Sequence, residues 1–301
     1  MLVVCFGYTG YKHAKFGKIE AHVAITAYSR EILLRAKEIA EAEGFSVLHM
    51  YVDGLWIKKP GACKPEDFQK VLDEIAETTG LSIALEGVFR WIAFLSSKLD
   101  ARIPVPNRYF GVYQNGEIKM RGIEARRGDA PKFIKDLQSE MLQILAVASS
   151  AEGIYVQLPR VINIVKQYLE NLRTGRIVLS DLVVRLKLGK DISAYKVSSP
   201  AAVAASQLEE EGKPVSVGQR ISLLYTRGND KVIAWDLSTQ VHFSQIDVQR
   251  YEDLLFRAAE TILIPFGVSD KMLRDWIIAR ASYLAPPGIL AGGDYTQPLF
   301  S

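Results

Sequence analysis

The sequence predicts an α+β fold, with an antiparallel sheet and long helices in its first half and a mainly helical second half. Residues 19–43 contain no Gly or Pro, and apolar residues recur through them at helical spacing. An Asp-Gly turn between two short apolar runs follows this helix and is a strong hairpin signal. The composition, 49% hydrophobic and 24% charged, is typical of a globular chain and excludes disorder and fibrous repeats.

In the first half, the long helix is expected to be amphipathic and to end at Gly44, because glycine commonly closes helices. Its predicted apolar face consists of Ile25, Tyr28, Ile32, Ala36 and Ile39. After it we predict hairpin strands over 45–49 and 55–57 around a turn at 52–54, a helix over 65–78, and strands over 84–94, 108–113 and 118–123, the last two joined by a turn at 114–116.

The second half begins after a helix predicted over 130–148, and we place a domain boundary near residue 150. The last residues, 285–301, hold three prolines and three glycines and are expected to form a loose tail. Between these points we predict helices over 155–173 and 201–211, strands over 182–187, 221–226 and 232–235, and helices that begin at Asp247 and Ser269.

The sequence indicates neither a membrane span nor a zinc site. Its longest apolar stretches, 142–147 and 262–266, are much shorter than the roughly 20 residues that cross a bilayer. Cys5 and Cys63 form no CxxC pair, and the four histidines lie too far apart for a zinc motif. We therefore expect an intracellular protein without a membrane partner, and we interpret both cysteines as structural.

Charge placement matters more than total charge, because a net charge of +3 does not by itself indicate a nucleic-acid partner. Between Tyr8 and Lys18 there are three lysines, three aromatic rings and no acidic residue, a mixture that can bind phosphates and bases. A solvated helix entry explains this segment equally well. A second basic cluster, from Lys119 to Lys135, is interleaved with acidic residues and is more typical of solvated surface.

Asp53 is the most unusual polar residue, because a carboxylate at the tip of a hairpin with apolar strands is fixed in place and points to one spot. Ordinary turn chemistry is an alternative explanation. The sequence contains no phosphate-binding GxxxxGKS loop, GxGxxG, GxSxG or HExxH motif. Asp53 is therefore the main candidate for chemistry.

Four segments, in the order in which they occur along the chain, resemble sequence motifs of one known protein family. Residues 5–11 read Cys-Phe-Gly-Tyr-Thr-Gly-Tyr, residues 47–61 contain Tyr-Val-Asp-Gly and end in Pro-Gly, residues 107–111 read Asn-Arg-Tyr-Phe-Gly, and residues 121–129 read Arg-Gly-Ile-Glu-Ala-Arg-Arg-Gly-Asp. They resemble the end of motif B, motif C, the Lys-Lys-Arg-Tyr-Phe-Gly element that contacts primer-template backbone, and the Arg-Gly-Leu-Glu-x-x-Arg-Arg-Asp element of family B DNA polymerases, especially the archaeal ones.

The resemblance implies a polymerase-type palm with an antiparallel sheet and long helices, followed by a mainly helical thumb domain. It divides the chain into the end of the fingers over 1–18, the C-terminal part of the palm over 19–149, the thumb over 150–284 and a flexible tail. It also implies a cytoplasmic, archaeal or prokaryotic nucleotidyltransferase of DNA replication that binds duplex primer-template DNA. The site residues that it implies are Asp53 for catalysis and Mg²⁺ binding, Phe6 for nucleotide binding, and Gly7, Tyr8, Gly10, Tyr11, Lys12, Lys15, Arg108, Tyr109, Arg121, Gly122, Arg126 and Arg127 for nucleic-acid binding.

The chain also departs from the family pattern. Tyr51-Val52-Asp53 stands where motif C has Asp-Thr-Asp, so that only the second carboxylate is kept. Phe6 replaces the motif B tyrosine, and Asn107 stands where the family has its DNA-contacting lysine. Motif A with its essential aspartate, the exonuclease domain and most of the fingers are not found in this sequence.

Two functional interpretations therefore stay open. Nucleotide addition uses two Mg²⁺ ions about 4 Å apart, which require carboxylates from separate elements. One aspartate does not supply these, so we expect the chain to be inactive alone. It is either a polymerase subunit or fragment whose exonuclease, motif A and fingers come from a second chain, or a catalytically inactive paralogue that acts as a DNA-binding scaffold in replication or repair. Retention of Asp53 favours the first interpretation, and the lost motif residues favour the second.

The final residues suggest one further partner. Thr296 to Ser301 resemble the short peptides with which polymerases of this family dock on a sliding clamp. Gln297 lies only two residues before Leu299, a closer spacing than in the Gln-x-x-Leu-x-x-Phe-Phe form of those peptides. Burial of Leu299 and Phe300 against the thumb is the alternative.

Overall fold

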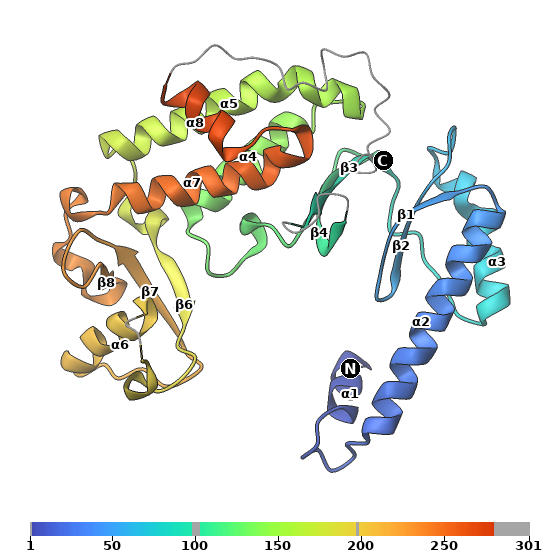
Figure 1. Cartoon of the computed structure of the whole chain (residues 1–301), viewed down its shortest axis with the longest axis horizontal. Coiled ribbons are helices and arrows are strands. Elements are labelled where there is room, and N and C mark those ends of the chain that lie inside the picture. Colours follow the sequence, from blue (N-terminus) through green and yellow to red (C-terminus); the bar gives the residue numbers. More distant parts are fainter. Residues whose placement is uncertain (1, 98–102, 197–198, 280–301) are drawn as a thin grey trace. The chain divides into compact units, whose positions relative to one another are not determined.

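The computed structural model describes residues 2–97, 103–196 and 199–279 (Figure 1). The chain forms two compact units. Unit 1 contains residues up to 90 together with 113–115, and unit 2 contains residues 91–112 and those from 116 onward. Each unit has its own hydrophobic core.

Unit 1 begins with two helices, α1 (Leu2–Thr9) and α2 (Ile19–Ala42). The long helix predicted over 19–43 is thus confirmed, and Gly44 follows it with a φ of 82°, a conformation that costs glycine little. The small side chains of Ala36 and Ala40 let α2 pack closely on α3 (Gln69–Thr79), which follows a 3₁₀ turn over Pro65–Phe68.

The apolar face predicted for α2 is only half correct. Of its five residues, Ala36 is buried and Ile32 and Ile39 are partly buried, but Ile25 and Tyr28 are exposed, Tyr28 by 72%. The reason is that the core of unit 1 forms only against the second half of α2, so that Ile25 and Tyr28 lie outside it.

The predicted hairpin is confirmed as β1 (Ser46–Tyr51) and β2 (Gly54–Lys58), an antiparallel pair in which Tyr51 is opposite Gly54. Val52 and Asp53 therefore form a two-residue turn. Val52 has a φ of 54°, which is uncommon for a β-branched residue. Asp53 lies at the exposed tip, where the sequence analysis expected it.

The next three strands form a sheet in the order β3-β4-β5. They are β3 (Phe89–Ser96), β4 (Pro104–Tyr113) and β5 (Ile118–Arg121), and β4 and β5 are antiparallel. Gly111 of β4 is needed for this packing, because an added Cβ would lie 2.7 Å from the carbonyl oxygen of Trp91. Strand β3 begins at Phe89, later than the predicted start at 84, and β4 begins at Pro104, earlier than the predicted start at 108.

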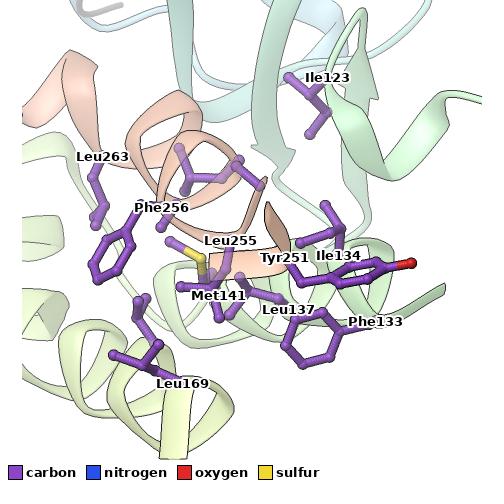
Figure 2. Close-up of a cluster of buried hydrophobic side chains, with 14 of the residues drawn as sticks. Ile123, Phe133, Ile134, Leu137, Met141, Leu169, Tyr251, Leu255, Phe256 and Leu263 are labelled. Atoms are coloured by element: carbon purple, nitrogen blue, oxygen red, sulfur yellow. The ribbon is translucent and has the colours of Figure 1, made fainter. Parts of the chain in front are cut away.

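Four helices form the main core of unit 2 (Figure 2). They are α4 (Lys132–Leu145), α5 (Ala151–Thr174), α7 (Val248–Leu263) and α8 (Asp270–Ile277). The buried side chains of α4 and α7 interdigitate, and each large aliphatic or aromatic side chain contributes roughly 1.5–3 kcal/mol. Figure 2 labels Phe133, Ile134, Leu137 and Met141 of α4, Leu169 of α5, and Tyr251, Leu255, Phe256 and Leu263 of α7.

A second antiparallel sheet of unit 2 has the order β6-β7-β8. Its strands are β6 (Val184–Lys187), β7 (Arg220–Tyr225) and β8 (Val232–Ala234), and α6 (Pro200–Glu210) packs against β8. Short 3₁₀ turns complete the described chain at Glu124–Arg126, Leu179–Leu182, Ile192–Ala194, Trp235–Gln240, Phe243–Gln245 and Ile264–Phe266.

The α+β fold class is confirmed. Residue 150, where we predicted a domain boundary, lies between α4 and α5, two helices that share one core. The predicted tail over 285–301 lies outside the described residues. In the ranges that the structure describes, no helix combines the length and the apolar content needed to cross a bilayer.

Candidate nucleic-acid interface and metal-binding aspartate

The hairpin of unit 1 holds Asp53 at a defined position. Gly54 lies against the Trp56 ring, and a Cβ at Gly54 would be 3.3 Å from that ring. At the other end of the hairpin, Val47 and Ile57 pack on the core of unit 1. The hairpin therefore fixes the backbone at Asp53, and the side chain of this residue is exposed.

Asp53 alone does not make a metal site. No group of three or more His, Cys, Asp and Glu side chains that could hold a metal ion occurs among the described residues. A carboxylate oxygen is the ligand type that Mg²⁺ prefers, but a pair of ions requires several such oxygens. The described residues therefore do not fit a complete two-ion site.

The motif B-like segment forms α1 and packs on α2 through aromatic contacts. The Phe6 ring stacks on His22 with a centroid distance of 4.3 Å. Nδ1 of His22 lies 3.2 Å from Oγ1 of Thr9. Gly10 lies so close to the His22 ring that an added Cβ would be 2.9 Å from its Nδ1 atom. Phe6, the residue predicted to bind nucleotide, thus already has one ring partner and is partly exposed.

The basic and aromatic residues at the end of α1 and directly after it lie at the surface of unit 1. Tyr8, Tyr11, Lys12 and Lys15 are all exposed, and a Cβ at Gly7 would meet nothing within 4 Å. The Lys15 ammonium lies 5.8 Å from the centre of the Phe16 ring. This surface can offer both cations and stacking faces to a ligand.

In unit 2, the structure brings together two elements that the sequence analysis identified separately. Tyr109 of β4 is paired with Arg121 of β5. Nε of Arg108 donates a hydrogen bond to the carbonyl oxygen of Gly122 over 3.0 Å. Gly122 has a φ of 64°, and an added Cβ would be 2.5 Å from the carbonyl oxygen of Asn107. Glycine is thus required where these two elements meet.

Tyr109 is placed differently from the other predicted binding residues. Its side chain is 3% exposed, and its ring centre lies 5.8 Å from that of Phe94. The neighbouring residues 110–113 of β4 are buried as well, so this end of the strand is enclosed on both faces. In this structure its ring is a packing element and is not open to a ligand.

The segment 121–129, which we call the arginine loop, presents three exposed guanidinium groups, those of Arg121, Arg126 and Arg127. Arg127 binds Asp129 in a bidentate pair, with distances of 2.9 Å from Nε and 2.5 Å from a terminal nitrogen. This hydrogen-bonded pair lowers the pKa of Asp129 and raises that of Arg127. In the described part of the chain, Arg121 and Arg126 have no ion-pair partner.

Three further cations, Arg185, Lys187 and Arg220, were missed in the sequence analysis. They are exposed on β6 and β7, with Lys187 opposite Arg220. The arginine loop contacts these strands, because a Cβ at Gly128 would lie 3.4 Å from the Arg220 guanidinium nitrogens. The alternation of basic and apolar residues over 184–187 was the available signal for an exposed basic strand face.

Comparisons with known proteins agree with the resemblance. A family model described as DNA polymerase family B matches residues 74–265. "DNA polymerase 2" of Aeropyrum pernix is 28% identical over 89% of this chain and 31% of its own length, and the "DNA polymerase" of Thermococcus kodakarensis is 28% identical over 89% of this chain and 16% of its own.

A solved structure, that of the family B DNA polymerase from Pyrobaculum calidifontis, matches with a TM-score of 0.58 and 25% identity, over 86% of this chain and 32% of that chain. The chain thus spans about a third, or less, of the relatives that it matches. The family model covers more than half of the chain, and it includes the arginine loop and the helices α4, α5 and α7 of unit 2. This chain therefore belongs to DNA polymerase family B.

Proposed function

We propose that this chain is the palm and thumb portion of a family B DNA polymerase, that it binds primer-template duplex, and that it contributes Asp53 to an active site completed by a second chain. The observation that carries the proposal is the arginine loop. Arg121, Arg126 and Arg127 are exposed on a segment whose backbone donates a hydrogen bond from Ala125 to the side chain of Gln138. Duplex DNA is bound mainly through its phosphates.

The duplex-binding part is tested with a labelled primer-template at several salt concentrations. Replacing Arg121, Arg126 and Arg127 by Ala should weaken binding at least tenfold. The slope of log affinity against log salt concentration should become shallower by up to about 0.9 per lost phosphate contact. The matched control replaces three exposed cations in and beyond α5, Arg160, Lys166 and Arg176, and thus removes the same charge. Equal affinities of the arginine-loop variant and the wild type would contradict the proposal.

The catalytic part is tested by primer extension. The chain alone should incorporate no nucleotide, and a chain that carries exonuclease, motif A and fingers should restore activity only when Asp53 is intact. Asp53→Ala should then cost several orders of magnitude in rate, since a metal ligand is lost. Asp73→Ala, at another exposed aspartate of unit 1, is the control. Activity of the lone chain, or full activity of Asp53→Ala in the pair, would refute the catalytic role.

The second chain is proposed to dock on the exposed apolar surface of α1 and the first half of α2. Between Ile19 and Tyr28 only Glu20 is charged, and exposed apolar side chains lie on opposite sides of the helix. A helix that is apolar all round is normally buried in protein. The occupant that we infer is the part of the family B fold that the relatives have and this sequence does not.

Val23→Asp combined with Tyr28→Asp tests this surface, and Val156→Asp, at an exposed valine of α5, is the control. The double variant should no longer form a complex with the second chain in size-exclusion chromatography with light scattering. Persistence of the complex would rule out the surface.

The second candidate function is that of an inactive DNA-binding scaffold. It is favoured because the described residues contain no group of three or more His, Cys, Asp and Glu side chains that could hold a metal ion, at Asp53 or elsewhere. It predicts duplex binding together with no activity in a well-formed complex. The proposed location is the cytoplasm, where such a duplex is available. Clamp docking through Gln297 stays a proposal, since the tail lies outside the described residues.

A further inference from the structure

The side chain of Gln138 on α4 makes three hydrogen bonds although it is fully buried, with 0% of its surface exposed. Its Oε1 accepts from the backbone N–H of Ala125 over 2.7 Å. Its Nε2 donates to Oε2 of Glu124 over 2.7 Å and to the carbonyl oxygen of Ala258 on α7 over 2.9 Å. One amide thus joins two core helices to the 3₁₀ turn over Glu124–Arg126.

This turn is part of the arginine loop. Ile123, directly before it, is fully buried in the core of unit 2, whereas Arg126 and Arg127 are exposed (Figure 2 shows Ile123). The Glu124 carboxylate is held inward, because its other oxygen lies 3.5 Å from Oγ1 of Thr261. Gln138 therefore controls both the path of the backbone and the direction of an acidic side chain within the loop.

We propose that Gln138 is a positioning residue for duplex binding. It fixes the turn so that Arg126 and Arg127 project together, and it keeps the Glu124 carboxylate away from the surface that receives phosphates. A carboxylate released toward that surface would repel phosphate and compete for the guanidinium groups. The proposal rests on the proposed function, because it requires that the arginine loop binds the duplex.

Gln138→Met tests the proposal, because it keeps the side-chain length and removes all three hydrogen bonds. Gln207→Met is a matched control. Gln207 on α6 also makes three hydrogen bonds in unit 2, to Asp230, Val232 and Ala234, far in sequence from the arginine loop. Both variants should lower the thermal stability, but only Gln138→Met should weaken binding of a labelled primer-template duplex.

For Gln138→Met we expect about a tenfold loss of affinity. We also expect the slope of log affinity against log salt concentration to be shallower by about 0.9, the value for one lost phosphate contact. In a background that combines Glu124→Gln, Arg126→Ala and Arg127→Ala, the same substitution should have little further effect, because the groups that Gln138 positions are then absent. Adding Glu124→Gln to Gln138→Met should restore part of the affinity, since the released side chain then carries no charge. A purely structural role predicts neither the coupling nor the rescue.

The outcomes separate the two proposals. If Arg126→Ala weakens binding and folded Gln138→Met does not, the positioning role is wrong and duplex binding by the loop stands. If neither variant weakens binding, the proposed function fails, and the positioning role fails with it. Should Gln138→Met not fold, Gln138→Asn replaces it, because it keeps the polar amide and shortens its reach. The same loss of affinity is then expected, and an unchanged affinity would overturn the proposal.

Discussion

The ion pair between Arg173 of α5 and Glu252 of α7 should make a large contribution to the stability of unit 2. Nε and a terminal nitrogen of Arg173 donate to the two carboxylate oxygens over 2.6 and 2.8 Å. Glu252 is only 5% exposed. Arg173→Met would thus leave a buried carboxylate without its partner, a change that costs about 3–5 kcal/mol when both charges are enclosed.

The Arg173 side chain is 43% exposed, so water screens the pair and we expect a smaller loss of about 2–3 kcal/mol in the free energy of unfolding. The double variant with Glu252→Met should lie within about 1 kcal/mol of the wild type, because no buried charge remains. Arg160→Met, at an exposed position on the same helix, should cost less than about 0.5 kcal/mol.

Urea unfolding followed by circular dichroism measures the wild type, Arg173→Met, Glu252→Met, the double variant and the Arg160→Met control, and the first four complete a double-mutant cycle. We expect strong coupling between the two sites. A double variant that loses the sum of the two single losses, or an Arg173→Met loss no larger than that of Arg160→Met, would show that burial of Glu252 does not determine the cost.

Two further predictions concern the arginine loop. Gly122→Ala should cost about 1–3 kcal/mol in unfolding free energy and weaken duplex binding, because φ is positive there and the added Cβ meets the Asn107 carbonyl oxygen. Gly116→Ala is the control, because Gly116 has a positive φ but an open Cβ position, so this variant measures the backbone strain without the steric clash. Asp129→Asn should raise the duplex affinity a few-fold by releasing Arg127, and unchanged binding would argue against a role of that guanidinium. Because folding lowers the pKa of Asp129, the pair contributes its full stabilisation above the unfolded value of 3.8 and loses it as the pH falls through the lower folded value. Asp129→Asn should lack this loss in acid unfolding.

Local patterns predicted much of the fold. The Asp-Gly signal located the hairpin and placed Asp53 at its tip, since a two-residue turn is decided by a few adjacent residues. The absence of Gly and Pro predicted α2, and Gly44 marked its end. The strands of the β3-β4-β5 sheet were predicted with shifted bounds, because their lengths depend on which residues find a partner strand.

Contacts between segments that are distant in sequence determined which side chains are buried and which basic residues lie together, and local patterns did not predict these features. Periodicity assigned Ile25 and Tyr28 to a buried face, yet burial depends on whether a neighbour exists to cover them. Tyr109 belongs to a segment that resembles a DNA-contacting element, but its ring packs near Phe94. Arg185 and Arg220 lie close to the arginine loop only because β6 and β7 pair beside Gly128 and Asp129.

By itself, the sequence determined the order of elements, the family to which the chain belongs and the basic character of the arginine loop. Only the tertiary structure determined how that loop is held. Gln138 reaches Glu124, 14 residues away, and Ala258, 120 residues away, and neither separation is visible in a local pattern. The physical reason is that a buried amide must satisfy its hydrogen bonds with whichever groups folding brings next to it, so that its partners are set by packing and not by spacing along the chain.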